Sequence, residues 1–478
     1  MNNLFALAPL LTIVVGALLI LILEAFLHTE NKSYLGFLSL FFLIASGALC
    51  FNSWTAGYTY FNGNLFLDKF SLALTLILIV AVCLIVLTSL KYISLQAANH
   101  GEYYALLLLA VSGMMVMVSS NNLLVIFLGL EVLSVSSYAL AGLRTADQRS
   151  SEAAVKYFLL GSFASAFFVF GLALLFAGAR SVEIPAIIGF FRTEAGLDLM
   201  AILGLGLIVV SFGFKVAFVP FHMWTPDVYQ GAPTPITAFF SVGTKAVGLA
   251  VLVRLLYSYW SEGFKSQPVF WLLWAIAALT MVVGNLMALR QTNLKRILAY
   301  SSIAHAGYLL VAILARDSAS LVFYLVAYLF MNIGAFAAIM AMSKKGTEYL
   351  ELEDYSGVGF KYPWIGATFA IFLLSLAGFP PTGGFLAKFF VFSSAVRQGL
   401  VPLVIIAVLA SLVSVFYYLR IVVYMYMRTP SREIDIDLEN PALYLVLFLC
   451  LYGVLQLGLF PGNVLIFIKQ AIAALPVF

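Results

Sequence analysis

Long apolar runs separated by short polar loops recur along the whole chain. Each run is long enough to cross a bilayer, because the hydrocarbon core takes about 20 consecutive apolar residues per helix. Proline and glycine interrupt two of the runs, which predicts helices that break inside the membrane. The pattern predicts fourteen spans, near 5–25, 35–53, 70–90, 103–119, 122–142, 154–178, 199–229 (broken), 236–258, 269–289, 296–314, 319–342, 364–397 (broken), 402–427 and 441–468.

The composition favours a membrane bundle over a soluble fold. Hydrophobic residues make up 63% of the 478 residues, charged residues only 10%, and the mean hydropathy is +1.06. A soluble globular domain carries about 25% charged residues. The first run begins close to Met1 without a basic segment or a small-residue cleavage site, so we expect a retained span, not a cleaved signal peptide. The predicted fold class is an all-α polytopic membrane protein.

The basic residues in the loops predict an orientation. With fourteen spans, thirteen Lys and Arg residues fall in loops on the side away from the termini, and eight fall on the terminal side. Cytoplasmic loops are enriched in Lys and Arg, so both termini are predicted to lie outside the cytoplasm. The net charge of +4 follows from this bias and requires no nucleic-acid partner.

Ionisable side chains inside the apolar runs are the main functional signal. They are Glu131, Lys156, Lys215, Lys245 and Lys388. A charge near the bilayer centre costs about 2.5–3.5 kcal/mol on insertion scales, so such residues mark transport pathways by default. Broken helices at this depth are tolerated only where they face protein or a polar cavity. The pattern therefore predicts a protein that moves protons or small cations.

Lys215 and Glu131 are the first candidate pair. Lys215 stands five residues before Pro220, where a helix must break and where freed carbonyls can hold water. Burial favours a neutral lysine and a nearby carboxylate favours a charged one, so a movable partner would switch its protonation. The alternatives are that Lys215 snorkels to an interface and that Glu131 is protonated and bonded to a hydroxyl such as that of Ser134.

The other titratable residues are predicted to extend this pair into a relay. Lys245 would pass a proton laterally toward the second half of the chain, where Lys388 would be the counterpart of Lys215. Lys156 lies nearer the start of its span and is a secondary candidate. His222 and His305 are secondary candidates because histidine changes charge near neutral pH. We expect Asp227 to cap or turn the broken segment without carrying protons.

The sequence offers no cofactor or metal site. Cys50, Cys83 and Cys450 are scattered without C-x-x-C spacing, and the four histidines lack the paired helical arrangement that a membrane haem requires. No glycine-rich nucleotide loop is found. We therefore expect this chain to bind no cofactor and no metal.

Two pairs of ionisable residues recur at nearly the same offset. Lys215 and Lys388 are 173 residues apart, and Glu131 and His305 are 174 apart. Each offset spans five predicted helices, and an odd number of spans inverts the second copy. The prediction is two inverted five-helix repeats, each with a discontinuous helix. Its boundaries are an N-terminal three-span segment at 1–102, repeats at 103–258 and 269–428, and a C-terminal span at 441–478.

The residues that carry this chemistry lie in family-specific strings. FLGLEVLSVSSYALAG, PFHMWTPDVYQGAPTPITAF, QTNLKRILAYSSIAHAGYLL and SLAGFPPTGGFLAKFFVF resemble subunit N of the proton-pumping respiratory NADH:quinone oxidoreductase (complex I), in the antiporter-like superfamily. The similarity runs from about Tyr103 to Arg428. The resemblance implies that Glu131 pairs with Lys215, and that Lys245 and Lys388 continue a lateral, water-filled axis. The chain ends at Phe478 without the lateral helix of sister subunit L and has Lys388 where subunit M has an acid, so subunit N is favoured.

The resemblance also implies what surrounds the chain. FMN, iron–sulfur clusters and quinone would be bound by other subunits, and the partners would be membrane-arm subunits including antiporter-like neighbours, membrane lipids and protons, with no nucleic acid. A bacterial inner (plasma) membrane is predicted ahead of an organellar inner or thylakoid membrane. The leading function is proton translocation coupled to quinone reduction elsewhere in the complex. The alternative is a secondary Na⁺/H⁺ or K⁺/H⁺ antiporter component, although Na⁺ prefers oxygen-rich sites and only one acid is buried here.

Overall fold

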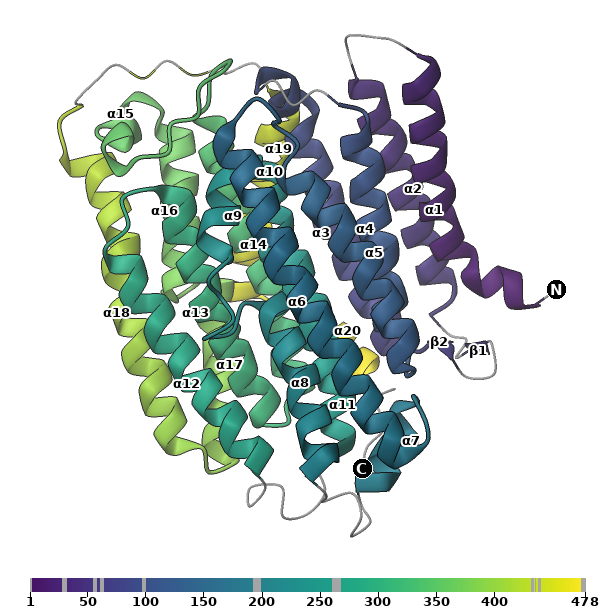
Figure 1. Cartoon of the computed structure of the whole chain (residues 1–478). Coiled ribbons are helices and arrows are strands. Elements are labelled where there is room, and N and C mark those ends of the chain that lie inside the picture. Colours follow the sequence, from purple (N-terminus) through teal and green to yellow (C-terminus); the bar gives the residue numbers. More distant parts are fainter. Residues whose placement is uncertain are drawn as a thin grey trace.

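The computed structural model describes residues 2–27, 32–54, 58–60, 64–96, 100–191, 199–259, 268–430, 434, 436 and 440–473. Almost all of this part of the chain is helical, and the helices run side by side in one bundle (Figure 1). The helices are α1 (Asn2–Phe26), α2 (Ser33–Asn52), α3 (Lys69–Leu95), α4 (Glu102–Val118), α5 (Leu123–Ala141), α6 (Gln148–Ala179), α7 (Ile184–Phe191), α8 (Leu199–Val216), α9 (Thr225–Gly231), α10 (Thr234–Phe239), the π-helix η2 (Phe240–Thr244), α11 (Lys245–Tyr259), α12 (Pro268–Leu289), α13 (Leu294–Leu314), α14 (Ser318–Ala341), the 3₁₀-helix η4 (Leu352–Tyr355), α15 (Val358–Lys361), α16 (Pro363–Ala377), α17 (Gly383–Arg397), α18 (Val401–Met427), α19 (Pro441–Leu459) and α20 (Gly462–Ile472).

The membrane crossings agree with the predicted fold class. Within the described ranges, twelve helices are long and apolar enough to cross a bilayer. The 17-residue α4 and the split pair formed by α16 and α17 complete the fourteen predicted crossings. The start of α1, the hairpin and α7 lie toward one side of the bundle, and α15 lies at the opposite side (Figure 1).

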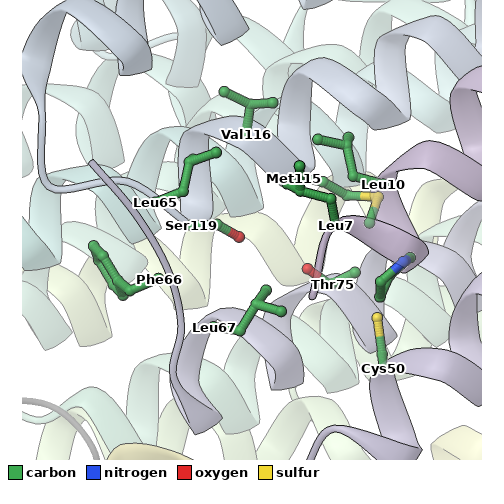
Figure 2. Close-up of a pocket in the computed structure, with 11 residues that line it drawn as sticks. Leu7, Leu10, Cys50, Leu65, Phe66, Leu67, Thr75, Met115, Val116 and Ser119 are labelled. Carbon is green, nitrogen blue, oxygen red and sulfur yellow. The ribbon is translucent and has the colours of Figure 1, made fainter. Parts of the chain in front are cut away.

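A short hairpin follows α2. Strands β1 (Tyr58–Tyr60) and β2 (Leu65–Leu67) pair antiparallel, with Tyr58 opposite Leu67. The Phe66 amide donates to the Ser119 carbonyl at 2.9 Å, which fixes the hairpin to the end of α4. A small cavity beside it, of about 30 Å³, is lined mostly by apolar side chains from α1, β2 and α4 together with Cys50 and Thr75 (Figure 2). It has room for about one water molecule and lies apart from the buried lysines.

Matched local features recur at an offset of 171 residues along the chain. Asn122 and Asn293, 171 residues apart, cap α5 and α13 by accepting amide hydrogen bonds through their side chains. Each also forms an isolated antiparallel bridge to a later acidic residue, Glu183 and Glu351 respectively. A Cβ atom on Gly113 would lie 2.6 Å from a carbonyl of α5, and one on Gly284, again 171 residues on, would lie 2.7 Å from an amide of α13. The close helix pairs α4–α5 and α12–α13 are therefore built alike.

Both predicted helix breaks are present. The first separates α8 from α9, with Ala217 in the left-handed region at φ 66°. The second separates α16 from α17, where Gly378 caps α16 at φ 92°, a conformation that glycine adopts without a steric penalty. Each connection contains a cis peptide bond before a proline, Pro220 and Pro381.

Candidate functional site

Lys215 lies at the end of α8, directly before the first break. Its side chain is buried, and its Nζ lies 5.4 Å from the ring centre of Tyr138 and 5.2 Å from that of Tyr157. The Tyr157 ring stacks on Trp224 at 4.5 Å and 9°, and the Trp224 indole donates to the Phe214 carbonyl at 2.9 Å. The ammonium is therefore enclosed by aromatic faces, which attract a cation without accepting its proton.

Several buried polar atoms on the elements at the first break have no hydrogen-bond partner in the part of the chain that the structure describes. Among the described residues, no hydrogen bond reaches Lys215 Nζ, the Tyr157 hydroxyl, Ser211 Oγ or Thr225 Oγ1. Buried polar groups are almost always hydrogen-bonded, and sites of this kind normally hold internal water. We therefore expect internal water at the first break.

Glu131 lies two turns before Tyr138 on α5, and its carboxylate accepts from Ser165 Oγ of α6 at 2.5 Å. The predicted hydroxyl partner, Ser134, donates instead to the Leu130 carbonyl. Within the described part of the chain, no ion pair joins Glu131 to Lys215. Glu131, which is only half-buried, and Lys215 thus lie on α5 and α8 without a direct contact, and their pairing stays a prediction.

Lys156 forms a surface ion cluster. Its Nζ lies 2.6 Å from both Glu152 and Asp227, and Asp227 also binds Arg296 at 2.7 Å. Lys156 is half-exposed, in line with its rank as a secondary candidate. Asp227 does more than turn the chain, because it joins α6 to α13.

Lys245 connects the two halves of the bundle. It follows the π-helix η2 and is fully buried, and its ammonium donates to the Ser302 carbonyl of α13. A second bond across the same boundary joins Asn332 of α14 to Ser241 of η2 at 2.5 Å. π-helical turns are rare and often occur at functional positions.

His305 is surrounded by tyrosines. Its Nδ1 lies 2.6 Å from the Tyr324 hydroxyl, and its Nε2 lies 3.3 Å from that of Tyr418, which also bonds to Ser301. The His305 ring packs edge-to-face on Tyr308 at 5.6 Å. Both ring nitrogens therefore have a hydroxyl partner that can donate or accept, as a proton relay requires.

Lys388 lies beyond the second break. Its Nζ donates to the carbonyls of Leu376 at 3.0 Å and Ala377 at 2.8 Å and to Ser411 Oγ at 2.9 Å, and it lies 5.3 Å from the Tyr308 ring centre. Lys215 precedes its break, whereas Lys388 follows its own, so the two are not at equivalent chain positions. The Lys388 side chain reaches back to the carbonyl end of α16, which corresponds to the end of α8 that carries Lys215.

His222 lies in the turn between α8 and α9 and is partly buried. In the described ranges no hydrogen bond joins it to the buried lysines, and its Nδ1 has no partner. Lys245 thus contacts the helix that carries His305, whereas His222 is not part of these contacts.

Sequence analysis missed two buried cations and one largely buried carboxylate. Lys295 precedes the predicted span 296–314, yet it is fully buried in the first turn of α13 and donates to the Ala232 carbonyl at 2.6 Å. Arg254 is buried on Asp68 at 2.8 Å. Glu348, from the loop after α14, binds Arg144 at 2.9 Å. Asn293 could have indicated the burial of Lys295, because an asparagine at the N-cap predicts a helix that begins before the apolar run.

A metal site would need several acidic, histidine or cysteine ligands close together. In the described part of the chain, no group of three or more such side chains could hold a metal ion.

Comparisons with known proteins agree with this architecture. The family model described as NADH:quinone oxidoreductase/Mrp antiporter, TM, matches residues 120–414. The chain is 42% identical to NADH-quinone oxidoreductase subunit N of Trichlorobacter lovleyi, covering 98% of this chain and 97% of the relative. It is 40% identical to the subunit N of Chloroflexus aggregans, over 98% and 97%.

Solved structures show the same fold. A chain of respiratory complex I from Thermus thermophilus superposes with a TM-score of 0.82 at 34% identity, covering 96% of this chain and 98% of that one. A chain of the Mrp complex from Dietzia superposes with a TM-score of 0.84 at 20% identity, over 98% and 97%, which is a likeness of fold alone. The chain therefore belongs to the subunit N family of the NADH-quinone oxidoreductases.

Proposed function

We propose that this chain moves protons in the membrane arm of NADH:quinone oxidoreductase through Glu131, Lys215, Lys245, His305 and Lys388. The observation that carries the proposal is the link at Lys245, whose ammonium contacts α13 one turn from His305. It joins a buried cation of the first half to the titratable groups of the second. The proposed repeats span 103–258 and 269–428.

In this scheme the Glu131–Lys215 separation controls proton affinity. When the carboxylate approaches, the charged lysine is stabilised; when it withdraws, burial favours release of the proton. The unpartnered hydroxyls around Lys215 support transfer through water to Lys245. His305 and its tyrosine hydroxyls then lead toward Lys388, whose carbonyl partners stabilise the charged ammonium.

Quinone reduction elsewhere in the complex would supply the free energy. A single charge that crosses 100 mV is worth about 2.3 kcal/mol, within reach of a change in one buried ion pair. FMN, iron–sulfur clusters and quinone would belong to other subunits, and neighbouring membrane-arm subunits and lipids would surround the chain. The proposed location is a bacterial inner membrane with both termini outside the cytoplasm. Lys156 and His222 stay secondary candidates.

The test replaces Glu131 by Gln in a strain that lacks the native chain. Inverted membrane vesicles are assayed for NADH-driven acidification, and a native gel stained for NADH oxidation reports assembly. We expect an assembled complex with reduced pumping, because the amide keeps the Ser165 contact but not the charge. Glu102→Gln, at an exposed carboxylate in the first turn of α4, is the control. Wild-type pumping in Glu131→Gln would contradict the proposal.

A further inference from the structure

Charged side chains from other elements bind the short helix α9, which lies between the first break and α10. Near its start, Asp227 accepts from Arg296 of α13 at 2.7 Å and from Lys156 of α6 at 2.6 Å. Arg296 also donates to Gln230, one turn further along α9, at 3.0 Å. A helix of the second half of the chain thus holds a seven-residue segment of the first.

The carbonyl end of α9 carries a second pair of cations. Lys295, adjacent to Arg296 on α13, donates to the Ala232 carbonyl at 2.6 Å, and Arg144 donates to the Gly231 carbonyl at 3.3 Å. The last carbonyls of a helix carry partial negative charge, so cations bind there favourably. Lys295 is fully buried, so its ammonium depends on these polar partners to offset the cost of burying a charge.

One carboxylate completes the network. Glu348 accepts from Arg144 at 2.9 Å, from the Thr234 hydroxyl at 2.5 Å and from the Tyr92 hydroxyl. Thr234 is the first residue of α10. Burial alone would raise the pKa of the Glu348 carboxyl, but the charges of Lys295 and Arg144 and the two hydroxyl bonds lower that pKa to about 2. Glu348 therefore stays ionised at neutral pH and acts as a fixed charge.

The position of α9 matters to the buried lysine before the break. Trp224 directly precedes α9, stacks on Tyr157 and donates to the carbonyl of Phe214, the neighbour of Lys215. Tyr157 in turn covers the Lys215 ammonium at 5.2 Å. A shift of α9 would move this aromatic cover.

We propose that Lys295, Arg296 and Glu348 are positioning residues, a charged clamp by which the second half of the chain holds α9 and sets the aromatic cover of Lys215. The inference rests on the proposed role of Lys215 in proton transfer. The clamp carries no proton itself. A movement of α13 would be transmitted through the clamp to the Lys215 site. The same helix accepts the hydrogen bond from Lys245.

The test compares Lys295→Met with Lys295→Arg in the assembled complex. Methionine fills a similar volume without charge, whereas arginine keeps a donor for the Ala232 carbonyl. We expect Lys295→Met to assemble but to lower the number of protons pumped per electron by about three- to tenfold, within the range of mutational coupling effects, and Lys295→Arg to restore much of the loss. Lys361→Gln is the matched control, because Lys361 bonds to a backbone carbonyl, that of Ile434, without touching α9.

The following results would decide whether the clamp exists. Wild-type proton pumping in an assembled Lys295→Met complex overturns the clamp. Failure of Lys295→Met to assemble also overturns it, since the charge would then serve folding only. Lys215→Met is measured in parallel: if that variant pumps normally, the proposed relay fails, and if it does not pump while Lys295→Met does, only the clamp fails. The charge exchange Asp227→Arg with Arg296→Asp is the second variant, expected to pump better than Arg296→Asp alone.

Discussion

Replacing Lys215 by methionine tests whether its ammonium serves proton transfer or only the stability of the fold. Methionine has nearly the length of lysine without the ammonium. In the described ranges Lys215 Nζ has no hydrogen-bond partner, so the change leaves no protein donor or acceptor unpaired. The two ring contacts contribute about 0.5–2 kcal/mol each. The removed cost of burying an ammonium is several kcal/mol. The variant should therefore be as stable as the wild type or more so.

Proton pumping should fall even though stability does not. Without a titratable group at the first break, the proton has no site between Glu131 and Lys245, and we expect quinone-coupled activity to fall at least about tenfold, or about 1.4 kcal/mol in barrier. NADH:quinone activity and vesicle acidification are measured on membranes with equal amounts of assembled complex on native gels. Lys345→Met, at an exposed loop lysine, is the control.

Two outcomes would contradict this role of Lys215. An assembled Lys215→Met complex with wild-type pumping would mean that Lys215 is outside the proton path. Loss of the assembled complex would mean that the ammonium is needed for structure, in conflict with the absence of a hydrogen-bond partner for it among the described residues.

Three further predictions follow from the same contacts. Lys388→Met should lower both pumping and thermal stability on native gels, because three acceptors at the second break lose their donor at about 1–3 kcal/mol each; unchanged stability would show that water replaces the ammonium. The pKa of Glu348 is lowered from 4.5 to about 2, so its ionised form should stabilise the fold by about 3 kcal/mol above pH 4.5, and this stabilisation should be lost as the pH falls toward 2. Glu348→Gln should therefore make thermal inactivation less dependent on pH on the acid side. An unchanged pH profile would contradict the network. Gly384→Ala should prevent accumulation of the complex, since the new Cβ would lie 1.9 Å from the Ser375 carbonyl; normal accumulation would mean that α16 and α17 can separate.

The membrane architecture could be predicted because its signals are local. Run length identifies a span, and Pro220 and Pro381 cannot continue a helix, so both breaks were found from the sequence. The fold confirms the fourteen-span, all-helical class and the family resemblance. The roles assigned to individual lysines stay predictions.

The contacts of the charged residues could not be predicted in the same way. Asp227 was expected to turn the chain, yet it pairs with Lys156 and Arg296 from helices far apart in sequence. Lys295 was placed in a loop because it precedes the apolar run, but its helix begins at Leu294. Nothing in a linear pattern says that α9 fits against the first turn of α13. Such contacts depend on tertiary packing.

The most direct test of the relay is at Lys245, where the two halves of the chain meet. NADH-driven acidification is measured in vesicles that carry Lys245→Met, alongside NADH oxidation by a soluble acceptor that takes electrons before they reach quinone. We expect normal oxidation with the soluble acceptor, a normal amount of complex and a loss of acidification. Acidification at the wild-type rate would contradict a proton path that passes between the two halves through this lysine.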